Sequence, residues 1–329
     1  PGPEPMRRPS IRAAPPRNPP PSRGIALVLV LWVLTLLTVM ALGMTQTQRT
    51  ETALVDNQVG GARFRASADA AIAYTMLSFL LPPSPEGLGL GESETEPERP
   101  WIPNGVPRSW TFDGEAMTIA VFNEGSRINL NQADPQLLAA LMRAVGLPDE
   151  EAAALADAVA DWRDEDDLKL LNGAEDGDYE DAGRPVGAKD APFATVEELQ
   201  QVLGMSPPLY QRLAPELTVE AEAATPDPRF ASPLVIAALE GIPLEEAELR
   251  VQERDSPLLE GGQGPGVIDR GGPLYRIEVR EQRGGRRLEA LVEQMPGQQP
   301  PYRVRWRRYG RASALPFSDV EPGALEDRR

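Results

Sequence analysis

Histidine and cysteine are both absent from the 329 residues of the chain. Without them there is no Ser-His-Asp or Cys-His catalytic unit, no disulfide, and no metal site built on imidazole or thiolate. Any metal would therefore be bound through oxygen. Glycine and proline are abundant, at 29 and 35 residues, which is typical of loop-rich structure between compact pieces. No catalytic constellation stands out, and we expect a protein that is not an enzyme.

Positive charge is scarce, with 33 basic against 50 acidic residues and a formal net charge of −17. Residues 1–24 are the exception, because five arginines oppose one glutamate there. Residues 126–220 contain 20 acids and 7 bases, a net of −13. Most of the negative charge thus lies in one internal block, and we expect no binding to nucleic acid.

The segment from Ile25 to Met44 is almost wholly apolar over 20 residues. A helix of that length spans the roughly 30 Å hydrocarbon core of a bilayer. The positive-inside rule keeps the basic leader cytoplasmic and puts the rest of the chain on the far side. A cleaved secretory signal is the alternative. The helical pattern continues to Leu81, before two prolines, with an apolar stripe of Leu54, Phe64, Ile72, Met76, Phe79 and Leu80.

Strand patterns occupy two separate parts of the remaining chain. The first part, residues 109–112 and 116–123, flanks a turn signal at Asp113-Gly114. The pattern returns only at residues 274–281, 287–294 and 302–309, and the stretch between is helical. We therefore predict an α+β fold in which a long N-terminal helix packs on an antiparallel sheet that a large helical insertion interrupts. The predicted segments are a leader (1–24), the helix (25–81), a linker and first strands (82–123), the insertion (124–257), returning strands (258–311) and a tail (312–329).

The predicted insertion repeats a pattern of two helices joined at a glycine, first near Gly146, then near Gly204 and Gly241. These pairs resemble helix-hairpin-helix and SAM-like modules. Modules of that kind often hold DNA backbone, so one alternative is a bitopic membrane protein with a helix-hairpin-helix ectodomain for DNA binding or uptake. The negative charge of this block opposes that alternative, because phosphate would be repelled.

The junction Arg23-Gly24-Ile25 resembles a type IV prepilin signal, in which prepilin peptidase cuts after the glycine. The resemblance implies that the mature chain starts at Ile25 and is methylated there. The family normally has a glutamate at the fifth mature position, where it neutralises the terminal amine of the next subunit above. Leu29 stands at that position here. A subunit without this glutamate is suited to the top of a filament.

These features, together with several internal motifs, resemble the general secretion pathway protein K family of type II secretion minor pseudopilins. The motifs are Asn129-Leu130-Asn131-Gln132-Ala133, the acidic run from Asp161, Gly173-Ala174-Glu175-Asp176 and the run from Glu197 to Met205. The resemblance implies a single-pass inner-membrane protein with a periplasmic C-terminal domain. Its implied partners are other minor pseudopilins, the major pseudopilin and prepilin peptidase, in an assembly that exports folded proteins across the outer membrane.

Ten carboxylates stand between Asp161 and Asp181, with only two basic residues among them. Oxygen ligands in a flexible loop suit Ca²⁺, although the EF-hand pattern fails, and a solvated acidic loop is the alternative. The resemblance favours calcium, because the family binds Ca²⁺ in the matching loop. Asp167 and Asp181 are reserve ligands. The candidate ligands are Asp161, Asp164, Asp166, Glu175, Asp176 and Asp178.

Three other features have ordinary structural interpretations. Trp162, at the end of a predicted helix, is expected in the core. The glycine-rich residues 262–266 have no strand before them and no helix after them, so we expect a loop. Arginines at 303, 305, 307 and 308 are expected to form one solvated face of a strand.

Overall fold

The structure is a computed structural model that describes residues 23–80, 101–259, 269–282 and 285–311. The chain divides into two units, Pro1–Ala62 and Arg63–Arg329, and each is described by itself. The predicted leader before residue 23, most of the linker, the glycine-rich loop at 262–266 and the tail after residue 311 lie outside the described residues.

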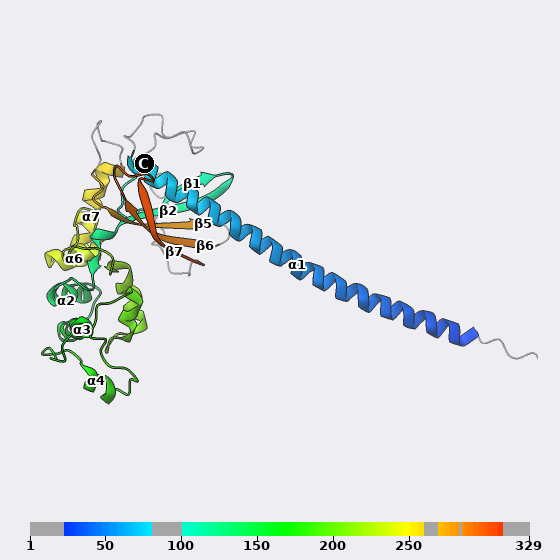
Figure 1. Cartoon of the computed structure of the whole chain (residues 1–329), viewed down its shortest axis with the longest axis horizontal. Coiled ribbons are helices and arrows are strands. Elements are labelled where there is room, and N and C mark those ends of the chain that lie inside the picture. The colour runs from blue at the N-terminus through cyan, green and yellow to red at the C-terminus, as the bar shows by residue number, and fades with distance from the viewer. Residues whose placement is uncertain (1–22, 81–100, 260–268, 283–284, 312–329) are drawn as a thin grey trace, which may run out of the picture. The chain divides into compact units, whose positions relative to one another are not determined.

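The first unit contains the apolar part of α1 (Arg23–Leu80; Figure 1). Residues Ala26–Met44 have a mean hydropathy of 2.6, and none of this segment is buried within the protein. It is therefore long and apolar enough to cross a membrane. Gly24 and Ile25 lie in the first turn of α1, and the side chain of Leu29 is 62% exposed. The helix ends at Leu80, two residues before Pro82, as the sequence predicts.

The second unit contains a five-stranded antiparallel sheet in the order β1-β2-β5-β6-β7. Strand β2 pairs directly with β5, with Ile119 opposite Val279, although about 150 residues separate them in sequence. The sheet is therefore interrupted, as predicted. Its turn at Asp113-Gly114 has φ of 49° and 76°. The strands are β1 (Arg108–Phe112), β2 (Glu115–Asn123), β5 (Leu274–Glu281), β6 (Arg286–Gln294) and β7 (Tyr302–Arg311).

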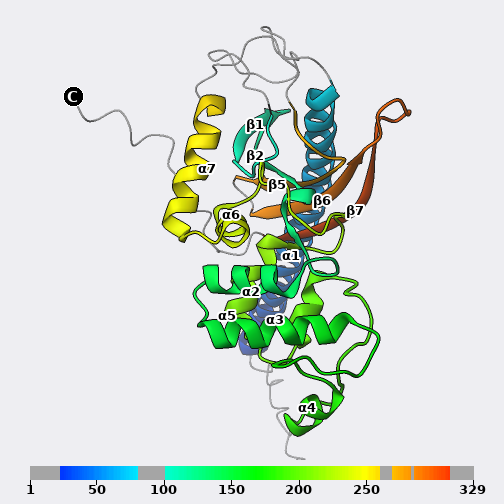
Figure 2. The same cartoon turned by 90° about the vertical axis from the view of Figure 1, so that its left-hand side faces the viewer.

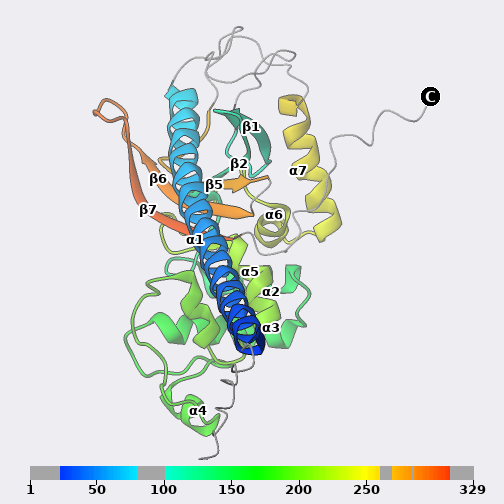
Figure 3. The same ribbon diagram turned by 90° about the vertical axis from the view of Figure 1, so that its right-hand side faces the viewer.

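The part of α1 in the second unit covers one face of this sheet (Figure 3). Side chains alternate between the two faces of a strand, and here the apolar set faces the helix. Leu54 and Leu80 of the predicted stripe are exposed at 56% and 36%, so the prediction was wrong for them. The core between α1 and the sheet includes Phe64, Ala68, Ile72, Met76, Phe79, Ile119, Ile277, Val279 and Leu288.

The helices between β2 and β5 have an apolar core of their own, and among the described residues it shares no member with the core under α1. α2 packs on α3 and on α6, which in turn packs on α7 (Figure 2). Gly146 has φ of 94° in the connection between α2 and α3, a conformation that side chains disfavour. The helices are α2 (Pro135–Ala144), α3 (Asp149–Arg163), α4 (Asp176–Asp181), α5 (Pro207–Leu213), α6 (Pro233–Glu240) and α7 (Leu244–Leu259).

Three 3-10 turns and a second, two-stranded sheet complete this block. The sheet pairs β3 (Ile128–Asn129) in parallel with β4 (Leu217–Thr218) and so brings together the two ends of the segment between them. The turns are η1 (Glu124–Ser126), η2 (Val196–Gln201) and η3 (Ala214–Glu216). The region near Gly204, expected as a helix pair, has η2 in place of its first helix. Resemblance of the block to SAM-like modules stays a prediction.

Candidate functional site

Asp161, near the C-terminal end of α3, is the most deeply buried of the predicted ligands, with no solvent exposure. The backbone N–H of Leu170 lies 3.3 Å from both carboxylate oxygens. A side chain at Gly173 would overlap the same carboxylate, so glycine is required there. Burial raises the pKa of Asp161, and the negative charges of Asp164 and Asp157 raise it further.

Glu175 lies at the centre of a group of carboxylates that repel one another. Burial raises the pKa of Glu175 to about 7, with further contributions from Asp161, Asp164, Asp190 and Asp167. The pKa of Asp164 is raised by burial and then by Asp166 and Asp190. Burial, Asp176 and Asp167 raise the pKa of Asp190. Each of these carboxylates is therefore harder to ionise, first because it is buried and then because its neighbours are charged.

Three oxygen atoms of this group are buried without a hydrogen-bond partner among the described residues: Oδ1 of Asp164, Oε1 of Glu175 and Oδ1 of Asp190. Buried polar atoms are normally satisfied, so these three oxygens fit a bound cation or ordered water. In the described part of the chain, however, no group of three or more acidic side chains is already arranged to hold a metal ion.

The other predicted ligands lie at the edge of this group. Asp178 accepts a 2.6 Å hydrogen bond from Lys169 and a 3.0 Å bond from the backbone N–H of Glu175. Those bonds lower the pKa of Asp178, led by the one from Lys169. Oδ1 of Asp166 accepts a 2.9 Å hydrogen bond from the backbone N–H of Leu168. Asp176 begins α4, and its carboxylate fills the space beside Gly187.

Asp190 was missed by sequence reasoning, and so was the helix α4. The acidic run ends at Asp181, nine residues before Asp190. Nothing in the spacing shows that the chain returns to the carboxylates of the run at Asp190. The signal was present in Glu175 and Asp178, which form a capping box: Asp178 accepts from the Glu175 backbone, and the Glu175 side chain accepts from Asp178.

The asparagines of the first motif hold the chain around this loop in place. Asn131 donates to the carbonyl of Phe193 at 2.9 Å and accepts the N–H of Phe193 at 2.7 Å. Asn129 donates to the carbonyl of Ala221. Trp162 is 4% exposed and packs against Phe193 and Tyr179, so its prediction as a core residue is confirmed.

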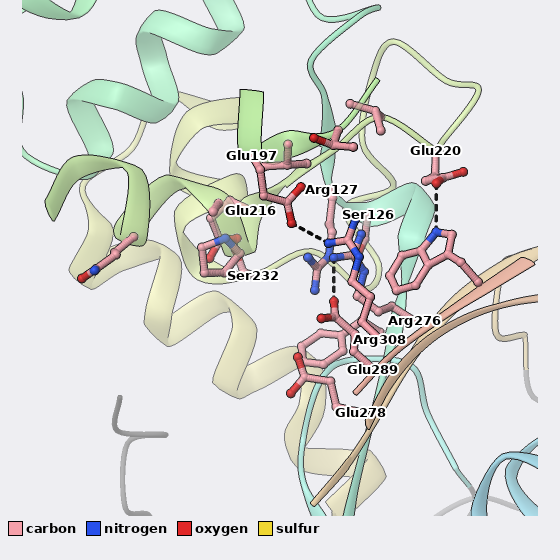
Figure 4. Close-up of a pocket in the computed structure, with 18 of the residues that line it drawn as sticks. Ser126, Arg127, Glu197, Glu216, Glu220, Ser232, Arg276, Glu278, Glu289 and Arg308 are labelled. Atoms are coloured by element: carbon pink, nitrogen blue, oxygen red, sulfur yellow. Dashed lines mark hydrogen bonds and ion pairs between the residues drawn. The ribbon is translucent and has the colours of Figure 1, made fainter. Parts of the chain in front are cut away.

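A second candidate site is a cleft of about 570 Å³ between the sheet and the helical block (Figure 4). Its sheet wall carries Arg276 and Glu278 of β5 and Trp306 of β7, on the face away from α1. The opposite wall includes Tyr210 of α5 and Glu216 of η3. The sequence does not indicate this cleft, because its walls come from segments far apart in the chain.

The arginines of β7 are less free than predicted, because they pair with acids on several elements. Arg308 donates to Glu197 of η2 at 2.6 Å, and Arg303 donates to Glu293 of β6 at the same distance. Arg307 lies 3.2 Å from Asp69 of α1. With Arg305 included, their side chains remain 32–59% exposed. They do not form one face, however, because Arg307 reaches Asp69 on the side of α1 while Arg308 lines the cleft on the opposite side of the sheet, so that part of the prediction was wrong.

Comparison with known proteins gives one consistent result at the level of sequence. The sequence profile of the family described as "Type II secretion system (T2SS), protein K" matches residues 120–222. Type II secretion system protein K of Klebsiella pneumoniae is 29% identical over 218 residues, which are 61% of this chain and 63% of that protein. The protein of the same name from Dickeya chrysanthemi is 27% identical over 283 residues, 70% of this chain and 77% of that protein.

The fold has a similar counterpart among solved structures. A chain of the crystal structure of the GspK-GspI-GspJ complex, from the Type 2 Secretion System of enterotoxigenic Escherichia coli, aligns with a TM-score of 0.51 and 20% identity. The alignment covers 78% of this chain and 98% of that one. At this identity the likeness concerns the fold.

Proposed function

Because the chain belongs to the type II secretion system protein K family, we propose that it is a minor pseudopilin that acts by assembly at the tip of the pseudopilus. The observation that carries this proposal is a sheet split by a helical block in a chain whose α1 contains a membrane-length apolar segment, since the family profile falls on that block. Packing with the other minor pseudopilins would nucleate the filament and so support export of folded proteins. No step of this function is catalytic.

Position at the tip follows from Leu29. A glutamate at this position would neutralise the N-terminal amine of the subunit above, and without that subunit its own charge would be left uncompensated in lipid, which is costly. An apolar residue there is compatible with a subunit that has no neighbour above it. The partners are accordingly other minor pseudopilins beside the chain and the major pseudopilin below it. The similar solved structure is of a complex of GspK with GspI and GspJ.

Processing by prepilin peptidase between Gly24 and Ile25, followed by methylation, belongs to the same proposal. Before the cut, Ala26–Met44 anchors the chain in the inner membrane with the basic leader cytoplasmic, and after the cut the anchor remains with the second unit periplasmic. Mass spectrometry of the protein from cells with prepilin peptidase is expected to find Ile25 as the N-terminal residue. An intact leader, or a cut after Met44, would contradict the assignment.

Calcium is proposed as the ion of the acidic loop. The support comes from the three buried carboxylate oxygens without partners and from the donor set, which is all oxygen. Asp161, Asp164, Glu175 and Asp190 would hold the ion, with Asp166, Asp167 and Asp176 close by, while Asp178 would first have to leave Lys169. The bound ion would neutralise charges that otherwise repel one another.

The experiment that tests the main proposal is deletion of the gene in its own host. Secreted enzymes are expected to accumulate in the periplasm, and re-expression of the chain is expected to restore export. A chain with an unrelated soluble leader in place of residues 1–44 is the control, since it keeps the second unit but loses the anchor. Normal export after deletion would overturn the proposal. The DNA-binding alternative has no supporting observation, and the acidic block opposes it.

A further inference from the structure

Arg127 follows η1 and lines the cleft between the sheet and the helical block (Figure 4). Its side chain is more than nine-tenths buried, with the residue 7% exposed. The guanidinium makes no hydrogen bond to any residue that the structure describes. The guanidinium makes one long ionic contact, with 3.9 Å between its Nε and Oε2 of Glu124. The central guanidinium carbon, Cζ, lies 5.0 Å from the centre of the Phe122 ring. A guanidinium has five N–H donors, so most of its hydrogen-bonding capacity is unmet.

The carboxylate of Glu124 does not accept the hydrogen bonds that the guanidinium of Arg127 could donate. Its carboxylate already accepts two bonds from Arg276, one of them at 2.9 Å, and a 2.5 Å bond from Thr218. Two buried guanidiniums therefore share one buried carboxylate. Burial lowers the pKa of Arg127, and the charge of Arg276 lowers it further. Glu216 attracts Arg127 at longer range, but its carboxylate is bonded to Ser232.

We propose that the floor of this cleft is a carboxylate-binding site in which Arg127 is the principal ligand. The planar fork of a guanidinium matches the two oxygens of a carboxylate. Tyr210 lines the same cleft, and its hydroxyl makes no hydrogen bond within the described residues, so it is available as a second donor. A volume of about 570 Å³ accommodates a side chain of a polypeptide or a small free acid.

The surroundings select for a single negative charge. Glu197, Glu216 and Glu289 also line the cleft, and Figure 4 shows them around the central arginines. These glutamates offset much of the attraction by the arginines, and the cost of removing a ligand from water rises with the square of its charge, so a phosphate dianion is disfavoured relative to a carboxylate. Each of them is already engaged: Glu197 by Arg308, Glu289 by Arg276 and Glu216 by Ser232.

The test is calorimetric titration of the full chain in detergent with three organic probes and, separately, with inorganic phosphate. The first is acetyl-Ala-Glu-Ala-amide, whose only charge is the side-chain carboxylate, and the second is its uncharged glutamine counterpart. The third is sodium acetate, used as a competitor. We expect the glutamate peptide to bind saturably and at least tenfold more tightly than the glutamine peptide. Competition by acetate is expected, because it carries the recognised group. Binding of acetate as tight as that of the peptide would assign the site to free acids, and much weaker binding would assign it to polypeptide carboxylates.

Variants separate this site from a structural arginine. Arg127→Gln is expected to abolish binding of the glutamate peptide, whereas Arg127→Lys, which keeps the charge and loses the fork, weakens it. Arg229→Gln is the matched control, because Arg229 pairs with Asp227 and Asp269 and does not line the cleft. If Arg127→Gln does not keep the wild-type circular dichroism spectrum, the proposal is tested with Tyr210→Phe instead. We expect that variant to bind the glutamate peptide several-fold more weakly than the wild type.

Four results would overturn the proposal. They are no saturable binding of the glutamate peptide, equal binding of the two peptides, unchanged binding in a folded Arg127→Gln chain, and tighter binding of inorganic phosphate than of the glutamate peptide. If Arg127→Gln does not fold, an unchanged affinity of Tyr210→Phe for the glutamate peptide would also overturn the proposal.

Discussion

Asp161 is fully buried near the end of α3, and its carboxylate occupies the space where a side chain at position 173 would lie. Gly173→Ala is expected to destabilise the protein by about 1 to 3 kcal/mol, because the added carbon forces the carboxylate or the loop to move. Thermal unfolding followed by circular dichroism measures this. Gly177→Ala in α4 is the control, since nothing lies within 4 Å of the added carbon. Equal stability of the two variants would show that Asp161 is not held beneath the loop.

Glu175 predicts a pH dependence of stability. Its pKa of about 7 in the folded state, against 4.5 ordinarily, means that the folded protein keeps a proton that the unfolded chain has released. The free energy of unfolding should therefore fall as the pH rises from about 5 to 8, by up to about 3 kcal/mol, because one pKa unit corresponds to about 1.4 kcal/mol.

This dependence is measured by chemical denaturation across that pH range with chelator present. Glu175→Gln should flatten most of the slope, and the raised pKa values of Asp161, Asp164 and Asp190 should leave a remainder of the same sign. Stability that increases over the same range would contradict the clustering of these carboxylates.

At the scale of elements, the turn between β3 and α2 is joined to the segment before η2 through one side chain. Asn131 makes two reciprocal bonds with the backbone of Phe193, which itself packs on Trp162. Asn131→Ala leaves both backbone groups without that partner, so we expect a loss of about 1 to 3 kcal/mol. Gln132→Ala, at the exposed neighbouring position, should change stability by less than about 0.5 kcal/mol. Thermal unfolding of both variants is the measurement, and equal midpoints would be the contrary result.

The elements differ in how far the sequence alone determines them. α1 and the strands were predicted closely, because an unbroken apolar run, period-two alternation and the Asp113-Gly114 turn are local signals. α4 was not, because six residues with four acids are typical of a solvated loop and their capping bonds outweigh that composition. Asp190 and Arg127 depend on contacts between distant segments. No spacing rule reports such contacts, so the cleft and part of the acidic group could only come from the structure.

On the scale of the whole molecule, the proposed ion predicts a change in stability. Ca²⁺ that binds only the folded chain raises the free energy of unfolding by about 2.7 kcal/mol at a hundredfold excess over Kd. The unfolding midpoint should therefore rise in calcium relative to chelator.

The comparison needs controls for charge screening and for residue identity. Glu175→Ala should abolish most of the calcium-dependent rise, while Asp255→Ala, in α7 beside Asn104 and Arg254, should leave the rise intact. An equal rise with Mg²⁺ or with simple salt would mean that the acids are a solvated surface.

The pairing of β2 with β5 fixes the order in which the molecule can be completed during synthesis. The apolar face of α1 leaves the ribosome early, but the strands β5 and β6 that cover it follow about 150 residues after β2. At roughly 5 to 20 residues per second, that interval lasts on the order of ten seconds or more. The helical block, with its separate core, is made within the interval and can fold first. A nascent chain can therefore carry a folded helical block while only β1 and β2 cover α1, and the rest of the apolar face of α1 is covered last.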